Sequence, residues 1–138
     1  MATTDGRKTR IYAIGLSGAP PIRPDIAHMT PEVVAAQSKA NREHLIAAGY
    51  DYRGMGIHDR GDFDEKFEKI KRELEDFQPD GYFMGFGLRG TAEYSDMFER
   101  SVNAGRRIVP HARMGFPPSP DRMAETVERV MSRTGAGQ

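Results

Sequence analysis

Glycine, arginine and histidine residues gather where the apolar runs of this chain end, and the densest group is Gly85-Phe86-Gly87-Leu88-Arg89-Gly90. This segment matches the motif G-x-G-x-x-G. An apolar run from Gly81 to Phe86 enters it, and a segment with helical spacing begins near Thr91. Glycines at a strand-to-helix turn leave backbone N–H groups open and let a ligand come close. We therefore expect an anion to be bound by Gly85, Gly87, Arg89, Gly90 and Thr91.

The glycine segment has two other readings. It can be a tight turn that allows close helix–strand packing, with no ligand at all. It can also be a dinucleotide fingerprint, which normally follows the first strand of its unit and has an acidic residue about 20 positions later. Residues 101–120 contain no acidic side chain, and no Gly-Lys-Ser/Thr follows the glycines. The dinucleotide reading is therefore disfavoured, and the first alternative stays open.

Three other loops carry side chains suited to anion binding or proton transfer. They hold Ser17 and Arg23, then His58 and Asp59, then His111 and Arg113. An unperturbed histidine titrates near neutral pH, which suits it to general acid–base catalysis. We expect His58, Asp59 and His111 to be the catalytic candidates, and Ser17, Arg23 and Arg113 to contact the ligand. Each histidine can equally be an ordinary structural residue.

Several kinds of chemistry are not expected. The chain has no Cys, which excludes disulfides, thiolate catalysis and Cys-ligated zinc. It has no H-x-H or H-E-x-x-H spacing, so we predict no metal and no cofactor. Ser17 lies in Gly15-Leu16-Ser17-Gly18, which lacks the G-x-S-x-G elbow of many serine hydrolases.

Strand-like and helix-like patterns alternate along the chain. The expected strands are 10–16, 51–57, 81–86 and a fourth from 107 to 111 or 112, and the expected helices are 30–48, 62–77, 91–104 and one that starts near 120. Thr30-Pro31-Glu32 has the signals of a helix start. Asp62 and Glu65 form a capping-box variant. The clearest helical stripe, with steps of four and three, consists of Phe63, Phe67, Ile70, Leu74 and Phe77.

This alternation predicts βαβ units and a parallel sheet. The expected fold is a three-layer α/β/α sandwich of flavodoxin-like character, with four strands in the order 2-1-3-4. We expect a flexible tail at 1–9, one domain at 10–133 and a second flexible tail at 134–138. Ligands of such sheets bind at the carboxyl ends of the strands, where the loops above would converge. With one strand fewer than the usual five, an edge is left for a partner subunit.

The bulk properties are those of an ordinary soluble protein. Of the 138 residues, 38% are hydrophobic and 29% charged, and 20 basic residues balance 20 acidic ones. The balance gives no reason to expect a nucleic acid or a membrane as partner. The polar start and the absence of a long apolar run favour the cytoplasm.

Short segments resemble known families. His111-Ala112-Arg113 is similar to a His-Ala-Arg triplet in type II dehydroquinases, which share the expected size and architecture. Their catalytic tyrosine and Asn-Gly-Pro-Asn pattern have no counterpart between Ser17 and Met29, so the resemblance does not imply their activity. His58-Asp59-Arg60-Gly61 resembles part of the cobalamin motif D-x-H-x-x-G, but Gly56 replaces its aspartate. Receiver domains share the architecture, whereas glycine stands where they carry the phosphorylated aspartate.

The residues together favour a small-molecule binding protein for an anionic metabolite. An enzymatic role as a cofactor-independent lyase or isomerase fits the histidines at the strand ends. The alternative is a regulatory or protein-interaction module without catalysis. The edge left by the missing fifth strand gives room for a homodimer or higher homo-oligomer.

Overall fold

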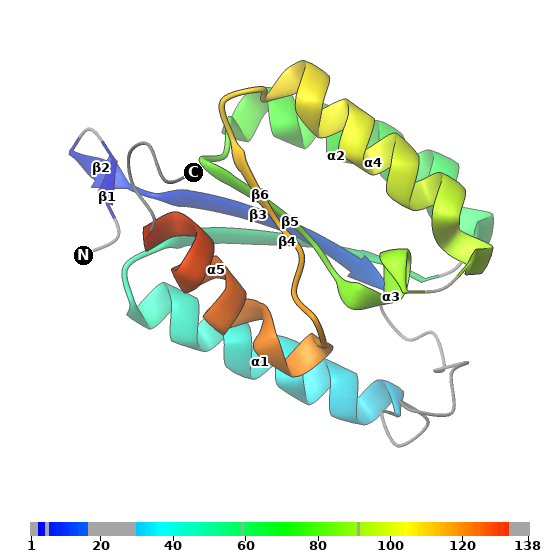
Figure 1. Cartoon of the computed structure of the whole chain (residues 1–138), viewed down its shortest axis with the longest axis horizontal. Coiled ribbons are helices and arrows are strands. Elements are labelled where there is room, and N and C mark those ends of the chain that lie inside the picture. Colours follow the sequence, from blue (N-terminus) through cyan, green and yellow to red (C-terminus); the bar gives the residue numbers. More distant parts are fainter. Residues whose placement is uncertain (1–2, 5, 17–29, 59, 91, 133–138) are drawn as a thin grey trace.

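The computed structural model describes residues 3–4, 6–16, 30–58, 60–90 and 92–132, which form an α/β/α sandwich (Figure 1). The strands of the main sheet are β3 (Arg10–Leu16), β4 (Asp51–Ile57), β5 (Gly81–Met84) and β6 (Arg113–Gly115). The helices are α1 (Pro31–Ala47), α2 (Phe63–Phe77), α3 (Phe86–Arg89), α4 (Ser95–Ile108) and α5 (Met123–Ser132). Short 3₁₀ turns occupy Arg60–Asp62, Ala92–Tyr94 and Pro120–Arg122.

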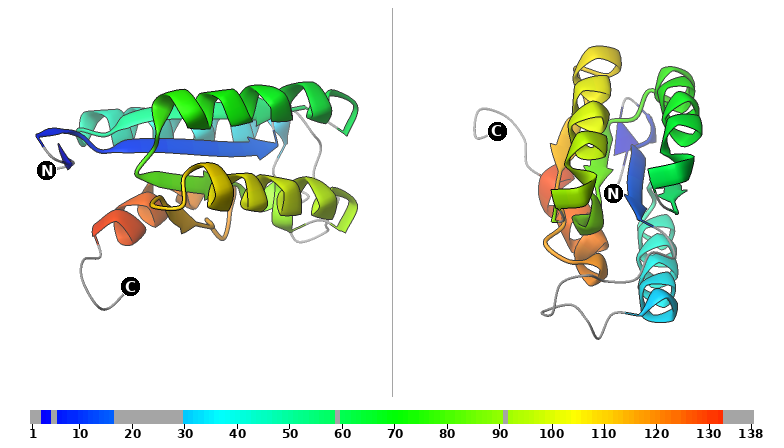
Figure 2. Two further views of the ribbon diagram at one scale, coloured as in Figure 1. Left: turned by 90° about the horizontal axis from the view of Figure 1, so that it is seen from above. Right: turned by 90° about the vertical axis from the view of Figure 1, so that its right-hand side faces the viewer.

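All neighbouring strands of the main sheet run parallel, in the order β4-β3-β5-β6. Counted along the chain, this is the expected order 2-1-3-4. Helices α2 and α4 cover one face and α1 and α5 cover the other, as the end-on view in Figure 2 shows. The expected three-layer, flavodoxin-like sandwich is confirmed.

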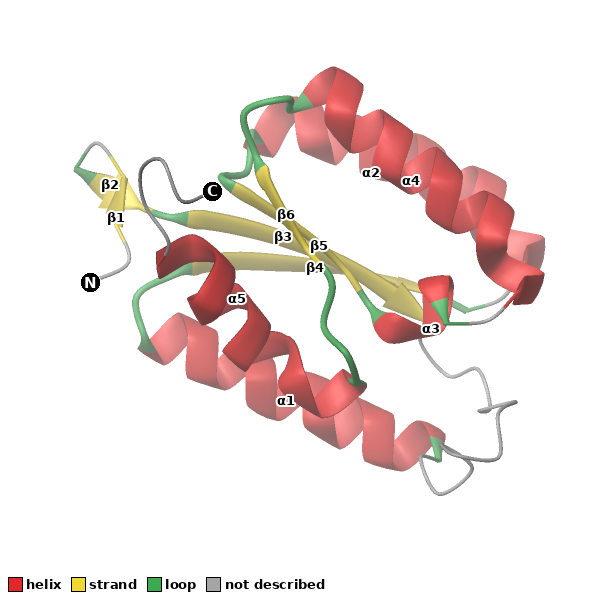
Figure 3. Ribbon diagram, viewed as in Figure 1, coloured by secondary structure: helices red, strands yellow, loops and turns green. Residues whose placement is uncertain are grey.

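Two apolar clusters hold the layers together. Tyr12 and Ile14 of β3 point toward α2 and α4, whereas Ile11 and Ala13 point toward α1 and α5. This alternation is the period of two expected for a strand buried on both faces. Figure 3 shows the strands enclosed between the two helical layers. All five residues of the predicted stripe on α2 are buried.

The helix starts were predicted with mixed success. Thr30 caps α1, because its side-chain oxygen accepts a hydrogen bond from the N–H of Val33 at 3.2 Å, and Pro31 is the first helical residue. The predicted capping box of α2 is wrong. Asp62 makes no side-chain hydrogen bond that caps this helix, and its Oδ2 instead accepts one from the N–H of His58 at 3.3 Å.

The largest error concerns the fourth strand. We expected the preceding helix to end at residue 104 and the strand to begin at Arg107, but α4 continues through Gly105 to Ile108. The strand is only Arg113–Gly115. Gly105 belongs in the helix because its missing Cβ makes room for the ring of Tyr82; a Cβ there would lie 2.4 Å from Tyr82 Cδ2. Val109, which looked like strand, ends the helix with a buried side chain.

Part of the segment 1–9, expected to be a flexible tail, has specific contacts. The short strands β1 (Thr3–Thr4) and β2 (Arg7–Lys8) pair antiparallel. Arg7 is joined to Asp80 by two hydrogen bonds, of 2.9 and 3.1 Å. The expected tail at 134–138 lies outside the described residues. None of the described helices has the length and apolar character needed to cross a membrane.

Candidate functional site

The loops after β5 and β6 meet at the carboxyl edge of the sheet. The segment Gly85–Gly90, expected as an open glycine loop, contains the single helical turn α3. Two of its backbone amides already make hydrogen bonds within the protein. The N–H of Gly85 donates to Ile14 O at 2.7 Å, and that of Gly90 donates to Phe86 O at 2.7 Å. Gly90 therefore does not offer the backbone donor that we expected for an anion.

Each glycine of the G-x-G-x-x-G segment stands where the packing leaves little room for a side chain. A Cβ on Gly85 would lie 3.3 Å from both Gly15 Cα and Ile14 O, so the residue that follows β5 lies close against β3. A Cβ on Gly87 would lie 2.9 Å from Leu16 Cδ1. A Cβ on Gly90 would lie 2.8 Å from the ring of Phe86. This geometry supports the reading of the motif as a tight turn with close helix–strand packing.

Arg89 remains a charged group at this edge. Its Nη2 donates to Pro117 O at 2.8 Å and makes a longer contact of 3.4 Å with Phe116 O. Its guanidinium carbon lies 5.4 Å from the centre of the Phe86 ring. The side chain is exposed, and its other N–H groups have no partner among the described residues. Arg89 thus ties two loops together and still has donors that face solvent.

His58 lies at the same edge but not beside Arg89. It follows β4 and is exposed. Because β3 separates β4 from β5, the ends of the two strands are two strand spacings, or roughly 10 Å, apart. A ligand that contacted both side chains would have to extend across the end of β3.

His111 and Arg113 do not join this site, and our expectation that they lie at the carboxyl edge is wrong. His111 precedes β6 and Arg113 is its first residue, so both lie at the opposite edge. The N–H of Arg113 donates to Asp80 O at 2.9 Å. Its Nη1 donates to Val130 O at 3.2 Å, near the end of α5, where a cation also interacts favourably with the helix dipole.

The sequence did not single out Asp80, which organises the amino edge of the sheet. Asp80 accepts hydrogen bonds from Arg7 and from the N–H of Arg10, the latter at 2.8 Å. Burial alone would raise the pKa of the Asp80 carboxyl, but the hydrogen bonds and charges of Arg7 and Arg10 hold this pKa below its usual range. The sequence around Asp80 indicated only a turn after a helix.

A second polar contact, which is partly buried, was also not foreseen. The hydroxyl of Tyr12 donates to Glu73 Oε1 at 2.5 Å. Burial, the hydrogen bond to Glu73 and the charge of Glu73 raise the pKa of Tyr12. Tyr12 therefore stays a neutral donor, and the hydrogen bond joins β3 to α2.

The predicted residues Ser17, Arg23, Asp59 and Thr91 lie outside the described residues. Within the described part of the chain, no three His, Asp or Glu side chains are grouped so as to hold a metal ion. Comparison with known proteins found no matching family, no matching curated protein and no matching solved structure.

Proposed function

We propose that this protein binds a small anionic metabolite at the carboxyl edge of its sheet, with Arg89 as the main contact. The observation that carries the proposal is the exposed guanidinium of Arg89, which Pro117 O and the Phe86 ring hold in position. A planar guanidinium with free N–H groups suits a carboxylate or a phosphate. Carboxyl edges of open parallel sheets are also where ligands of such folds bind.

Catalysis is a second part of the proposal, in which His58 would transfer a proton on a ligand held by Arg89. This arrangement corresponds to a lyase or isomerase that needs no cofactor, with one histidine at the edge instead of two. We also propose that the protein is cytoplasmic and forms a homodimer or higher homo-oligomer. In the alternative, the protein is a regulatory or interaction module whose carboxyl edge binds no metabolite.

Thermal-shift screening against phosphorylated and carboxylated metabolites tests the binding site. A ligand that binds only the native state raises the melting temperature by mass action. For the best anion, Arg89→Ala is expected to weaken affinity roughly 10- to 100-fold. Arg89→Lys keeps the charge but loses the forked geometry, so an intermediate loss is expected.

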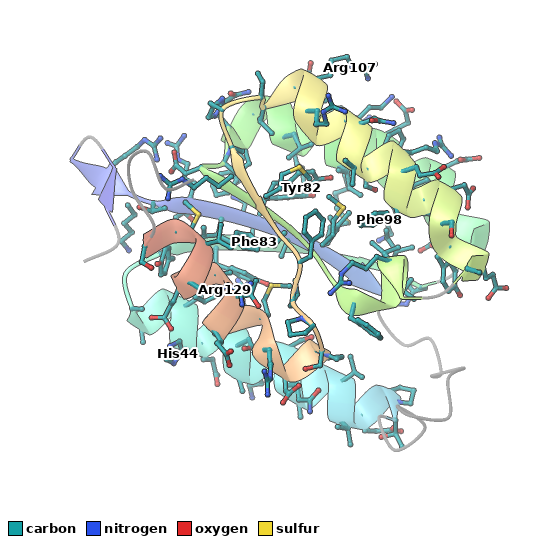
Figure 4. The ribbon with its side chains drawn as sticks, in the orientation of Figure 1. His44, Tyr82, Phe83, Phe98, Arg107 and Arg129 are labelled. Carbon is teal, nitrogen blue, oxygen red and sulfur yellow. The ribbon has the colours of Figure 1, made fainter. Side chains whose placement is uncertain are left out.

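Arg107→Ala is the matched control, because Arg107 is an exposed arginine on α4, far from the carboxyl edge (Figure 4). It should leave the affinity unchanged. The binding proposal fails if no anion raises the melting temperature, or if Arg89→Ala binds the anion as tightly as the wild type. His58→Ala tests the catalytic part separately, since it should abolish turnover while the anion still binds.

A further inference from the structure

The sheet ends at β6, and this edge is open. The N–H of Arg113 faces β5, because it donates to Asp80 O. Backbone groups of successive strand residues point to opposite sides, so the N–H and C=O of Met114 point away from the sheet. Neither group has a partner among the described residues. In Figure 1, β6 crosses in front of the other strands, and no described element lies in front of it.

Apolar side chains border this edge on the face covered by α4. Ala112 and Met114 are partly buried against the core on that face, as are Phe98 and Val102, one turn apart on α4. The ring of Phe116 is 37% exposed and lies 5.9 Å from that of Phe98, centre to centre. We name these five residues the edge surface: Phe98, Val102, Ala112, Met114 and Phe116.

Two opposite charges lie beside the edge surface. Glu99 and Arg106 are seven residues, or about two turns, apart on α4. Helical spacing places both on the same side of α4 as Phe98 and Val102. Arg100 lies on the other side, where it pairs with Asp64 of α2 at 3.1 Å. Glu99 and Arg106 are both exposed, and neither has an ion-pair partner among the described residues.

We propose that a second copy of this chain covers the edge surface, with its β6 antiparallel to the first about a two-fold axis at Met114. In this register the two Met114 residues exchange both backbone hydrogen bonds. Ala112 then faces Phe116 of the partner subunit, so that a small side chain meets a large one. Arg113 faces Gly115 of the partner subunit, which leaves room for the arginine.

The charges complement each other under the same axis. The two copies of α4 run antiparallel, which brings Glu99 near Arg106 of the partner subunit and repeats the contact by symmetry. A surface that supplies both halves of each contact is suited to its own copy. The inference rests on the homo-oligomer in the proposed function and gives it a surface; it does not depend on the anion.

Sedimentation equilibrium from about 1 µM to 1 mM protein tests the interface. The wild type is expected to form a dimer. Glu99→Arg alone and Arg106→Glu alone should each raise the dimer dissociation constant about tenfold or more, because both symmetric contacts become repulsive. The double variant Glu99→Arg/Arg106→Glu should return it to within about threefold of wild type, since the charges are exchanged.

Arg107→Glu is the matched control. It makes the same charge change one residue away, at an exposed position about 100° further round the helix from the edge surface. It should change the dissociation constant much less than Arg106→Glu. The amide hydrogen of Met114 supplies an independent readout, since its exchange should slow as dimer forms.

A wild type that remains a monomer throughout the concentration range overturns both the interface and the homo-oligomer. A dimer that ignores the two single charge reversals, or that leaves the Met114 amide in fast exchange, overturns this interface alone. Neither result bears on the anion, whose binding is measured by the Arg89 variants.

Discussion

Gly105 shows how one missing side chain sets the distance between α4 and the sheet. A Cβ at this position would lie 2.4 Å from Tyr82 Cδ2. Tyr82 cannot move away easily, because it is fully buried and its hydroxyl donates to Ser101 O at 3.0 Å. Gly105→Ala should therefore lower the free energy of unfolding by about 1–2 kcal/mol, since overpacking outweighs the gain in helix propensity.

Urea denaturation measures this change. Asn103→Ala, at an exposed position of the same helix, is the control and should leave stability unchanged or slightly raised. A Gly105→Ala variant as stable as the wild type would show that Tyr82 or α4 shifts at little cost.

Asp80 provides a prediction about pH. Its folded-state pKa is lowered, so its stabilising contribution is present above the unfolded pKa of about 4 and is lost as pH falls through the folded pKa. At pH 7, Asp80→Asn should lower the free energy of unfolding by about 1–3 kcal/mol, because it removes the charge that Arg7 and the Arg10 amide contact. The difference from wild type should shrink below pH 4.

Denaturant titrations at pH 7 and pH 3 measure that difference. Asp76→Asn, an exposed aspartate on α2, should match the wild type at both values. If Asp80→Asn lost the same free energy at both values, the role of Asp80 would be packing and not charge.

Among the elements, the fourth strand lies a few residues later in the chain than expected, and this difference removes two predicted residues from the candidate site. Ile108 and Val109 follow Gly105, and this pattern favours a strand after a helix stop. The glycine is instead required by Tyr82, which is distant in sequence, and the apolar pair ends α4. Because the strand is Arg113–Gly115, His111 precedes it and lies at the amino edge of the sheet, opposite the candidate site. Local patterns cannot reveal such a contact between distant residues.

Asn41 joins two helices and carries another prediction. Its Oδ1 accepts a hydrogen bond from the N–H of Ala124 at 2.8 Å, and its Nδ2 donates to Pro120 O at 3.2 Å. Ala124 is in the first turn of α5, where N–H groups have no partner within the helix, so Asn41 caps α5 from α1. Asn41→Ala should lower the free energy of unfolding by about 1–2 kcal/mol.

Hydrogen exchange locates this loss, because the amides of α5 should exchange faster than those of α2. Asn41→Asp keeps the acceptor for Ala124 and should retain part of the protection. Ser38→Ala, at an exposed position of α1, is the control. Equal exchange in all three variants would count against the cap.

At the scale of the whole molecule, the architecture could be predicted because it depends on repeated, redundant signals. The apolar stripe of a helix and the apolar run of a strand each indicate which face is buried, so the architecture is predicted several times over. The wrong bounds of one strand therefore left the predicted order of the sheet unchanged. The candidate site has no such redundancy. Arg89 was predicted to lie at the carboxyl edge and does, but its contacts with Phe116 O and Pro117 O join loops 27 and 28 residues apart.

The stability of the whole molecule should depend on protein concentration. If two copies pair through β6, unfolding also separates them, so the melting temperature must rise with protein concentration. For a dimer of this size, a hundredfold rise in concentration above the dissociation constant should raise it by about 3–5 °C. Glu99→Arg should flatten this dependence at the lower concentrations, and the double variant Glu99→Arg/Arg106→Glu should restore it. A melting temperature independent of concentration in the wild type would mean that the open edge at β6 is stable without a partner.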